Sequence, residues 1–171
     1  MNAISKSCLS LILLTISATA LCSCGEEIRK EYYENGNIKA ETSYKENILH
    51  GKAIYYFKNG DIKETGYYKN GKKHGEWLEF CHNGQKKEET HYVDGKEDGV
   101  RKRWEKDCSI LSSETHYSKG KKHGPSKMWK NGKPMDEIFY SEGEVVSVKV
   151  WNDDGSINCT FTTDQELCPN K

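Results

Sequence analysis

The sequence repeats itself at intervals of 24 residues. A turn dipeptide recurs at this interval, and a tyrosine and a glycine recur in phase with it. The dipeptides are Asn35-Gly36, Asn59-Gly60, Asn83-Gly84, Asp107-Cys108 and Asn131-Gly132; the tyrosines are Tyr44, Tyr68, Tyr92, Tyr117 and Tyr140; the glycines are Gly51, Gly75, Gly99 and Gly124. Three kinds of position that share one period indicate an internal repeat. Repeat arrays usually present extended binding or scaffold surfaces rather than catalytic pockets.

Each unit has the pattern of a β-hairpin. An aromatic stretch with interleaved polar residues leads into the turn dipeptide, and Asn-Gly is a strong hairpin signal because both central residues of the favoured turn have positive φ. The segment after the first turn alternates with period two, which places Ile38, Ala40, Thr42 and Tyr44 on one face. The sequence therefore predicts an all-β fold, an elongated antiparallel β-meander of about five 24-residue hairpin repeats with a half-exposed sheet.

The repeats occupy residues 30–144. Residues 145–163 form the most β-branched stretch and are expected to be a C-terminal capping hairpin, because repeat arrays need ends that differ from the middle. A tail follows over residues 164–171. One step of the repeat, from Tyr92 to Tyr117, is 25 residues long. Since an inserted residue reverses the alternation unless a bulge absorbs it, we expect a β-bulge at residues 110–113.

Residues 1–23 have the character of an export signal. Lys6 is their only charged residue, and the apolar run from Leu9 to Leu21 has the length of a signal-peptide core. This run is shorter than the roughly 20 residues of a membrane-spanning helix. The residues around Cys24 resemble the bacterial lipobox, which predicts cleavage after Ser23, a lipid on Cys24 and a tether over residues 24–29. An ordinary signal peptide or membrane anchor is the alternative.

The expected location is the bacterial cell envelope, with the protein anchored through the lipid on Cys24. Gly25 and Glu26 follow this cysteine. They do not resemble the Asp-containing retention signal of inner-membrane lipoproteins in enteric bacteria. The outer membrane is therefore the favoured location.

Four cysteines remain besides those of the signal and the lipidated Cys24: Cys81, Cys108, Cys159 and Cys168. An even number suits disulfides in an oxidising compartment. A Cys159–Cys168 bond would close a short loop in the tail. A Cys81–Cys108 bond would link neighbouring repeats across a separation of roughly 10 Å if both lie on like strands. Because a disulfide requires Cα atoms about 4.4–6.8 Å apart, that bond needs the turn carrying Cys108 to curl back over the sheet.

Charge and motif content exclude several classes of function. The chain has 26 basic and 26 acidic side chains, so its net charge gives no attraction to nucleic acid. Nucleophile, nucleotide-binding and zinc-type motifs are absent from the sequence. His50, His74 and His123 precede closing glycines, but consecutive copies lie roughly 10 Å apart and cannot share an ion, which favours a role in turns. No catalytic residue, metal or cofactor is therefore expected, and the chain is not expected to be an enzyme.

Two sets of side chains are candidate binding surfaces. The first is aromatic and comprises Trp77, Phe80, Trp104, Trp129 and Trp151; the second is basic and comprises Lys72, Lys73, Lys121 and Lys122. Rigid rings give good contact area for a partner, although they also serve to hold a thin sheet together. Alternation indicates that Trp77 and Phe80 point to opposite faces unless a bulge intervenes.

The units resemble the MORN repeat, and more closely its bacterial variant in proteins labelled YwqK-family antitoxin. The matching residues are Gly75-Glu76-Trp77, Phe80, Asn83-Gly84 and the run from Tyr92 to Gly99, and the likeness extends over roughly residues 30 to 151. The units depart from the pattern at Cys108, at Pro134 and at Asn47-Ile48. The resemblance implies a curved β-meander with a binding role, and the antitoxin label implies neutralisation of a partner.

These observations predict a non-catalytic, membrane-anchored module for protein interaction or scaffolding in the bacterial envelope. An antitoxin or immunity protein that neutralises a specific toxin is the first alternative. Lipid or glycan binding is the second. The sequence does not specify the partner protein or the oligomeric state.

Overall fold

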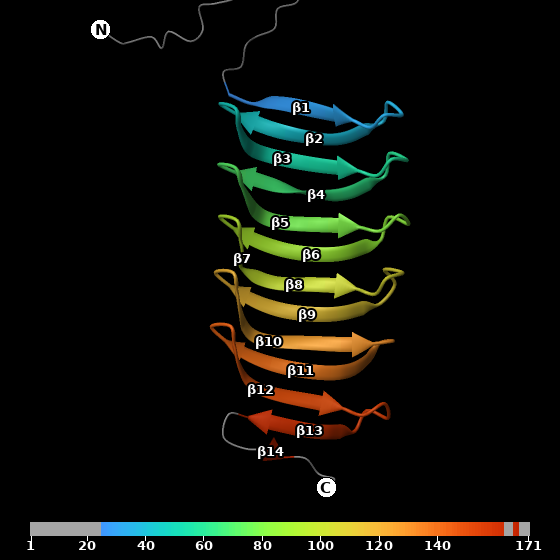
Figure 1. Cartoon of the computed structure of the whole chain (residues 1–171), viewed down its shortest axis with the longest axis vertical. Coiled ribbons are helices and arrows are strands. Elements are labelled where there is room, and N and C mark those ends of the chain that lie inside the picture. Colours follow the sequence, from blue (N-terminus) through green and yellow to red (C-terminus); the bar gives the residue numbers. More distant parts are fainter. Residues whose placement is uncertain (1–24, 163–165, 168–171) are drawn as a thin grey trace, which may run out of the picture.

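The computed structural model describes residues 25–162 and 166–167, which form one antiparallel sheet (Figure 1). In chain order its strands are β1 (Glu27–Tyr32), β2 (Ile38–Lys45), β3 (Ile48–Tyr56), β4 (Ile62–Lys69), β5 (Lys72–Phe80), β6 (Lys86–Val93), β7 (Lys96–Glu97), β8 (Gly99–Trp104), β9 (Leu111–Ser118), β10 (Lys121–Lys130), β11 (Lys133–Ser141), β12 (Glu144–Trp151), β13 (Ile157–Thr162) and β14 (Glu166–Leu167). Each strand pairs with its neighbour in sequence, except that both β7 and β8 pair with β6. The predicted all-β meander is confirmed.

The strands stack into an elongated single layer with turns along both edges (Figure 1). Strands β12 and β13 continue the sheet at the C-terminal end, and β14 pairs with β13. The proposed signal over residues 1–23, the lipidation site Cys24 and most of the tail, Cys168 included, lie outside the described residues. Within the part of the chain that is described, no helix is long and apolar enough to cross a membrane.

The turns at the 24-residue dipeptide series lie along the right edge in Figure 1. In the turn after β3, the Gly60 N–H donates to the carbonyl of Phe57, and the Asn59 side chain accepts from the backbone N–H of Asp61. Only Gly60 of this dipeptide has positive φ, and the same holds at Gly36 and Gly84. The prediction of positive φ at both dipeptide positions was therefore wrong for these three turns, although it holds at Asn131-Gly132. The Asn side chain favours these turns by an Asx hydrogen bond.

Two-residue turns with positive φ at both positions occupy the left edge instead. They are Glu46-Asn47, Asn70-Gly71, Asp94-Gly95, Lys119-Gly120 and Glu142-Gly143. This is the geometry of type I′ hairpins, whose twist matches that of the flanking strands. The Gly71 N–H donates to the carbonyl of Leu49 in the preceding unit, and the later turns repeat this bond. Successive turns are therefore stacked by backbone hydrogen bonds.

The glycines that recur in phase with the turns lie where the strands bend. Thr42 pairs with Ala53 but Tyr44 pairs with Leu49, so β3 carries extra residues between these points. Gly51 lies in this bulge with a φ of 105°. Gly75, Gly99 and Gly124 have positive φ at the equivalent positions. A bulge with a left-handed residue bends a strand and increases its twist. Each strand that leads from one hairpin into the next is therefore bent.

The extra residue of the fourth unit lies in a turn. A register shift does occur opposite Leu111 and Ser113, but an equivalent shift occurs in the other hairpins as well. The Glu105 N–H donates to the carbonyl of Ile110, whereas the Cys81 N–H of the preceding unit reaches only to Gln85. A register shift thus lies at residues 110–113 as expected, but it does not absorb the insertion. The turn lengthens instead, and the strand alternation is preserved.

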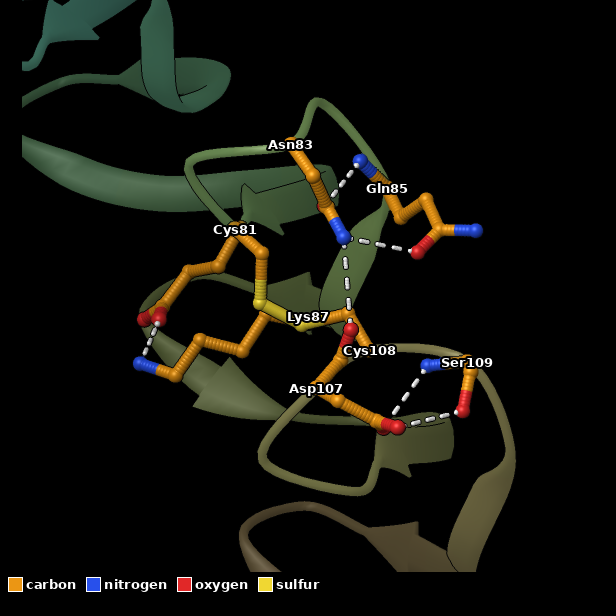
Figure 2. The surroundings of a disulfide bond; sticks show 8 residues. Cys81, Asn83, Gln85, Lys87, Asp107, Cys108 and Ser109 are labelled. Carbon is orange, nitrogen blue, oxygen red and sulfur yellow. Dashed lines mark hydrogen bonds and ion pairs between the residues drawn. A yellow bond between two sulfur atoms is a disulfide. The ribbon is translucent and has the colours of Figure 1, made fainter.

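This longer turn carries a disulfide between Cys81 and Cys108 (Figure 2). The two Cα atoms are 6.4 Å apart, within the range of about 4.4–6.8 Å that a disulfide spans. The turn thus curls back toward its neighbour, as the bond requires. Cys159 is also disulfide-bonded, and Cys168, its predicted partner, lies outside the described residues.

The core is a single row of small side chains across the middle of the strands. Its buried members include Thr42, Ala53, Gly66, Trp77, Thr90, Thr115 and Ser126. Trp77, 3% exposed, is the one large side chain in this row. A methyl group added at Gly66 would overlap the indole of Trp77, so the ring packs directly on the glycine backbone. Such a thin core leaves most of both sheet faces open to solvent.

Candidate functional site

The two faces of the sheet carry different aromatic residues. Tyr44, Tyr68, Tyr92, Tyr117 and Tyr140 share one face with the core row, which we call the tyrosine face. The opposite face carries what we call the aromatic row, which comprises Tyr32, Tyr56, Phe80, Trp104, Trp129 and Trp151. Alternation along each strand separates the two sets. As predicted, Trp77 and Phe80 therefore lie on opposite faces.

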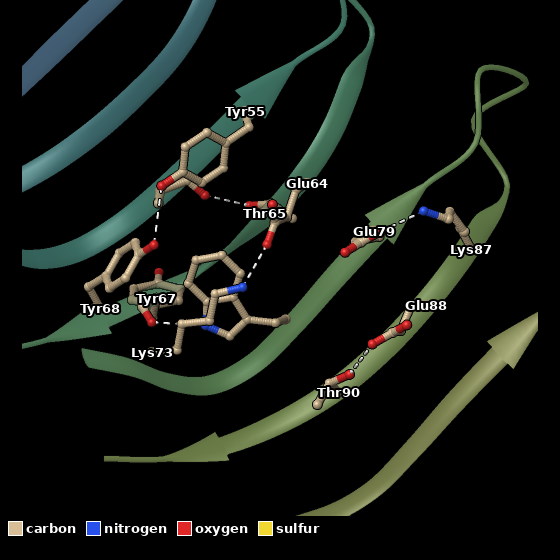
Figure 3. A network of polar contacts seen from close by, with 12 residues as sticks. Tyr55, Glu64, Thr65, Tyr67, Tyr68, Lys73, Glu79, Lys87, Glu88 and Thr90 are labelled. Atoms are coloured by element: carbon tan, nitrogen blue, oxygen red, sulfur yellow. Dashed lines mark hydrogen bonds and ion pairs between the residues drawn. The ribbon is translucent and has the colours of Figure 1, made fainter. Parts of the chain in front are cut away.

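Trp77 organises the tyrosine face. Its ring meets Tyr68 edge to face at 5.0 Å between centroids, and its indole N–H donates to the backbone carbonyl of Tyr67 at 3.0 Å. The Tyr68 hydroxyl lies 3.2 Å from that of Tyr55 (Figure 3). Burial and this hydrogen bond raise the pKa of Tyr55. The contacts assign Trp77 to packing, so it does not contribute to an exposed binding surface.

Cations lie over most of the tyrosine rings. The Arg29 guanidinium is 4.2 Å from the centroid of Tyr44, and the Arg101 guanidinium is 4.7 Å from that of Tyr117. The Lys73 ammonium lies 3.8 Å from the Trp77 centroid, and Lys122 lies 4.6 Å from that of Tyr140. Such cation–π contacts attract the cation to the ring face and add to the packing of this face. Those of Lys73 and Lys122 join residues across bulges, so period-two alternation did not reveal them.

The carboxylates of this face are paired with bases. Glu64 accepts from Lys73 at 2.8 Å and Glu79 from Lys87 at 3.0 Å (Figure 3). Glu88 accepts from Arg103 at 2.6 Å and from the Thr90 hydroxyl at 3.1 Å. These ion pairs neutralise the three carboxylates and link neighbouring strands. Within the described residues, no three His, Cys, Asp or Glu side chains gather in a way that would hold a metal ion.

The candidate lysines do not form one basic surface. Lys73 and Lys122 lie over rings of the tyrosine face, as described above. Lys72 is exposed and its side chain packs against Gly95 of the next turn. The exposed Lys121 lies 3.8 Å from a carboxylate oxygen of Glu142. The left edge is therefore a mixed-charge surface.

The histidines and their substitute, Asp98, fasten successive turns. The Asp94 N–H donates to Nδ1 of His74 at 3.5 Å, and the Glu142 N–H donates to Nδ1 of His123 at 3.4 Å. In the fourth unit the Lys119 N–H donates to the Asp98 carboxylate at 3.1 Å. An imidazole nitrogen and a carboxylate thus serve the same purpose at this position. This geometry agrees with the predicted role in turns.

The aromatic row runs the length of the sheet beside the right-edge turns. Each ring lies at or next to the end of its strand, and its cross-strand partner is usually apolar. The partners in order are Ile38, Ile62, Lys86, Leu111, Pro134 and Ile157. Sequence reasoning found four members of this row but missed Tyr32 and Tyr56. Their position before the turn dipeptide was the signal that could have revealed them.

Comparison with protein families gives three consecutive matches. Residues 28–46, 49–70 and 73–94 each match the family described as the MORN repeat variant. The chain is a MORN-variant repeat protein. The matched stretches coincide with successive strand–turn–strand segments, and the same geometry continues beyond residue 94. A search of curated proteins finds no match.

Membership in this family bears on function. MORN repeats are generally modules for interaction with proteins or membranes and are typically non-catalytic. In this MORN-variant protein the tyrosine face is taken up by packing, cation–π contacts and ion pairs. The aromatic row is the regular apolar feature that no second layer covers in the described structure. It is therefore the candidate interaction surface.

Proposed function

We propose that this MORN-variant protein is a non-catalytic interaction module that holds a partner protein against its aromatic row, tethered to the bacterial envelope through a lipid on Cys24. The observation that carries the proposal is the row itself. One aromatic residue per unit stands at an equivalent position on one uncovered face. Scaffolding follows from its length, because a row that crosses every hairpin offers several equivalent contacts.

The chemistry of the row suits a protein partner. Trp and Tyr are enriched among the residues that dominate protein–protein binding energy, since they bury much area at a small entropic cost. The three Trp side chains of the row are only partly buried, so their outer surfaces remain available. The ion pairs Lys30–Glu41 and Lys127–Glu137 lie on the same face. An apolar strip beside paired charges is the arrangement of an interface core with a polar rim.

The envelope location rests on the N-terminal sequence. The apolar run before Cys24 and its lipobox-like end support export and lipidation. A Cys24→Ala variant is expected to remain uncleaved or to become soluble in cell fractionation. Release of a mature-size protein from the membrane fraction in both forms would instead indicate cleavage of an ordinary signal peptide.

Crosslinking and affinity capture from the native cells, read by mass spectrometry, test the binding role. We expect captured proteins to be lost from the Trp104→Ala/Trp129→Ala variant. Tyr67→Ala is the matched control, because Tyr67 is a 55% exposed ring on the same face but outside the row. Equal capture by all three proteins would contradict the proposal. A single stoichiometric partner that poisons cells unless this protein is present would narrow the function to an antitoxin.

A further inference from the structure

The seam between the third and fourth hairpins differs from the other seams of the sheet. The strand that should cross it is interrupted at Asp98, so that β7 ends at Glu97 and β8 begins at Gly99. Strand β6 pairs with β7 through Tyr92 and Val93, and with β8 through Glu88 and Glu89. The middle of β6, where Thr90 lies in the core row, has no registered partner in β8, as Gly66 has none in β5. Asp98 itself is joined to β6 by its N–H, which donates to the carbonyl of His91.

The core row also changes character at this seam. Arg101 occupies the position that Ala53, Trp77 and Ser126 occupy in other units. Its side chain is 19% exposed and donates to Glu97 at 2.7 Å. Across the seam itself, Arg103 donates to Glu88 at 2.6 Å. Ionic contacts thus replace the buried side chains of the other seams, and partly exposed ion pairs stabilise a junction less than buried packing does.

The disulfide crosses this same seam. Cys81 lies in the turn after β5 and Cys108 in the turn after β8, and these two turns flank the seam (Figure 2). Within the described residues, the other neighbouring right-edge turns are joined without a disulfide, for example by the hydrogen bond from Asn37 to the carbonyl of Lys58 and by the stacking of Phe57 on His82 with ring centroids 3.9 Å apart. Cys108 has a left-handed φ of 64° where the equivalent turns have glycine, and its turn holds the extra residue. Several departures from the repeat therefore coincide with the bond.

The disulfide also lies close to two members of the aromatic row. Cys81 directly follows Phe80, and Cys108 lies in the turn that follows Trp104. These two rings stand on either side of the seam. A bond between the turns therefore fixes the spacing between the rings of Phe80 and Trp104. A hinge at the seam would otherwise allow this spacing to vary.

We propose that the Cys81–Cys108 disulfide is a redox-controlled latch over a hinge between the third and fourth hairpins. With the bond closed, residues 27–93 and the units beyond them form one continuous array. With the bond open, the two blocks move relative to each other at Asp98. Opening the bond would also change the spacing between Phe80 and Trp104 in the aromatic row and thereby partner binding. That consequence rests on the proposed function, whereas the hinge itself does not.

Opening the latch requires a dithiol reductant. Cys108 is 3% exposed whereas Cys81 is partly exposed, so the reductant thiolate attacks the Cys81 sulfur. The S–S bond breaks, a mixed disulfide forms at Cys81, and Cys108 leaves as a thiolate that takes up a proton. The second thiol of the reductant then displaces Cys81. Two electrons and two protons pass to the protein, and the reductant leaves as a disulfide.

Hydrogen exchange of the full chain tests the hinge. In Cys81→Ser/Cys108→Ser we expect amides of β6 and β8 to exchange at least about tenfold faster, while those of β3 and β4 change by less than about twofold. Cys159→Ser is the matched control, since it removes a disulfide far from the seam, and it should leave β6 and β8 unchanged. Uniform acceleration along the chain, or none, would overturn the latch.

A second comparison uses the ion pair across the seam. Glu88→Gln should change β6 exchange by less than about threefold while the disulfide is closed, and by about tenfold more in the Cys81→Ser/Cys108→Ser background. Equal effects in both backgrounds would show that the bond does not brace this seam. Affinity capture with the same variants separates the two proposals. Altered exchange with unaltered capture would retain the hinge and remove its link to the aromatic row.

Discussion

At the scale of the residue, one tryptophan decides how the middle of the sheet is filled. Thr42 lies opposite Ala53, and Thr115 lies opposite Ser126, so these two places need no large side chain. The third unit instead places Trp77 over Gly66, which leaves no room for a side chain at the glycine. The two positions therefore form an exchangeable pair, in which either a ring covers a glycine or two small side chains meet.

We predict that Trp77→Ala lowers the free energy of unfolding by about 3–5 kcal/mol, because it leaves a cavity over Gly66. Adding Gly66→Thr should recover about 1 kcal/mol, since the pair then matches Thr42 and Ala53. Denaturant unfolding of the two variants measures both effects. The control is Gly66→Thr alone, which should be destabilising because it clashes with the ring. A double variant no more stable than Trp77→Ala would contradict the pairing.

Asp136 is a residue whose charge opposes folding. Its Oδ1 is buried without a hydrogen-bond partner among the described residues, and burial raises its pKa. A carboxyl with a raised pKa binds its proton more tightly in the folded state. Its penalty is therefore absent below the unfolded pKa, near 3.9, and develops as the pH rises through the folded pKa.

We accordingly predict that Asp136→Asn raises the free energy of unfolding by about 1 kcal/mol at pH 7 and by nothing near the unfolded pKa. Thermal melts over a pH series measure the difference from the parent. Asp153→Asn provides the control, because Asp153 is exposed. A gain that is the same at both ends of the series would show that the carboxylate charge is not its cause.

At the scale of the element, the turns at the two edges of the sheet differ in backbone geometry. Right-edge turns such as Asn59-Gly60 use an Asx hydrogen bond and one left-handed residue, whereas the left-edge turns and the right-edge turn Asn131-Gly132 use two left-handed residues. Sequence showed that Asn-Gly dipeptides end the strands but not which geometry each adopts, because the same dipeptide serves both, as Asn59-Gly60 and Asn70-Gly71 show. The number of residues between the flanking strands makes the difference.

The substitution of His by Asp at residue 98 gives an element-scale test. Asp98→His should change the free energy of unfolding by less than about 0.5 kcal/mol, because His74 and His123 hold the next turn in the same way. Asp98→Ala should cost about 0.5–1.5 kcal/mol, since the Lys119 N–H loses its acceptor. Thermal or denaturant unfolding distinguishes them. Equal losses for both variants would mean that the hydrogen bond to the turn contributes nothing.

Some features of the strands could be predicted from the sequence and others could not. The meander, the hairpin positions and the opposite orientations of Trp77 and Phe80 follow from period-two alternation. The cation–π contacts of Lys73 and Lys122 did not, because the Gly-centred bulges shift the register between the turn and the middle of the strand. Alternation cannot be carried across such a shift.

At the scale of the whole molecule, stability is a property of neighbouring hairpins. The sheet has no second layer, and each hairpin contacts only those before and after it (Figure 1). Stability in such arrays is approximately a sum of unit and nearest-neighbour terms. The array should therefore accept a further unit as long as the phase of the repeat is kept.

The phase of the repeat should decide whether an added unit folds into the sheet. A second copy of residues 51–74 inserted after residue 74 should fold as one more hairpin, lengthening the sheet by roughly 10 Å. The melting temperature should stay within a few degrees of the parent's, because the new unit adds about as many neighbour contacts as it needs. The control insertion lacks Thr65, which turns the second half of β4 to the opposite face. Small-angle scattering and thermal melts compare the two proteins. If both melt alike, strand alternation does not decide whether the added unit packs into the sheet.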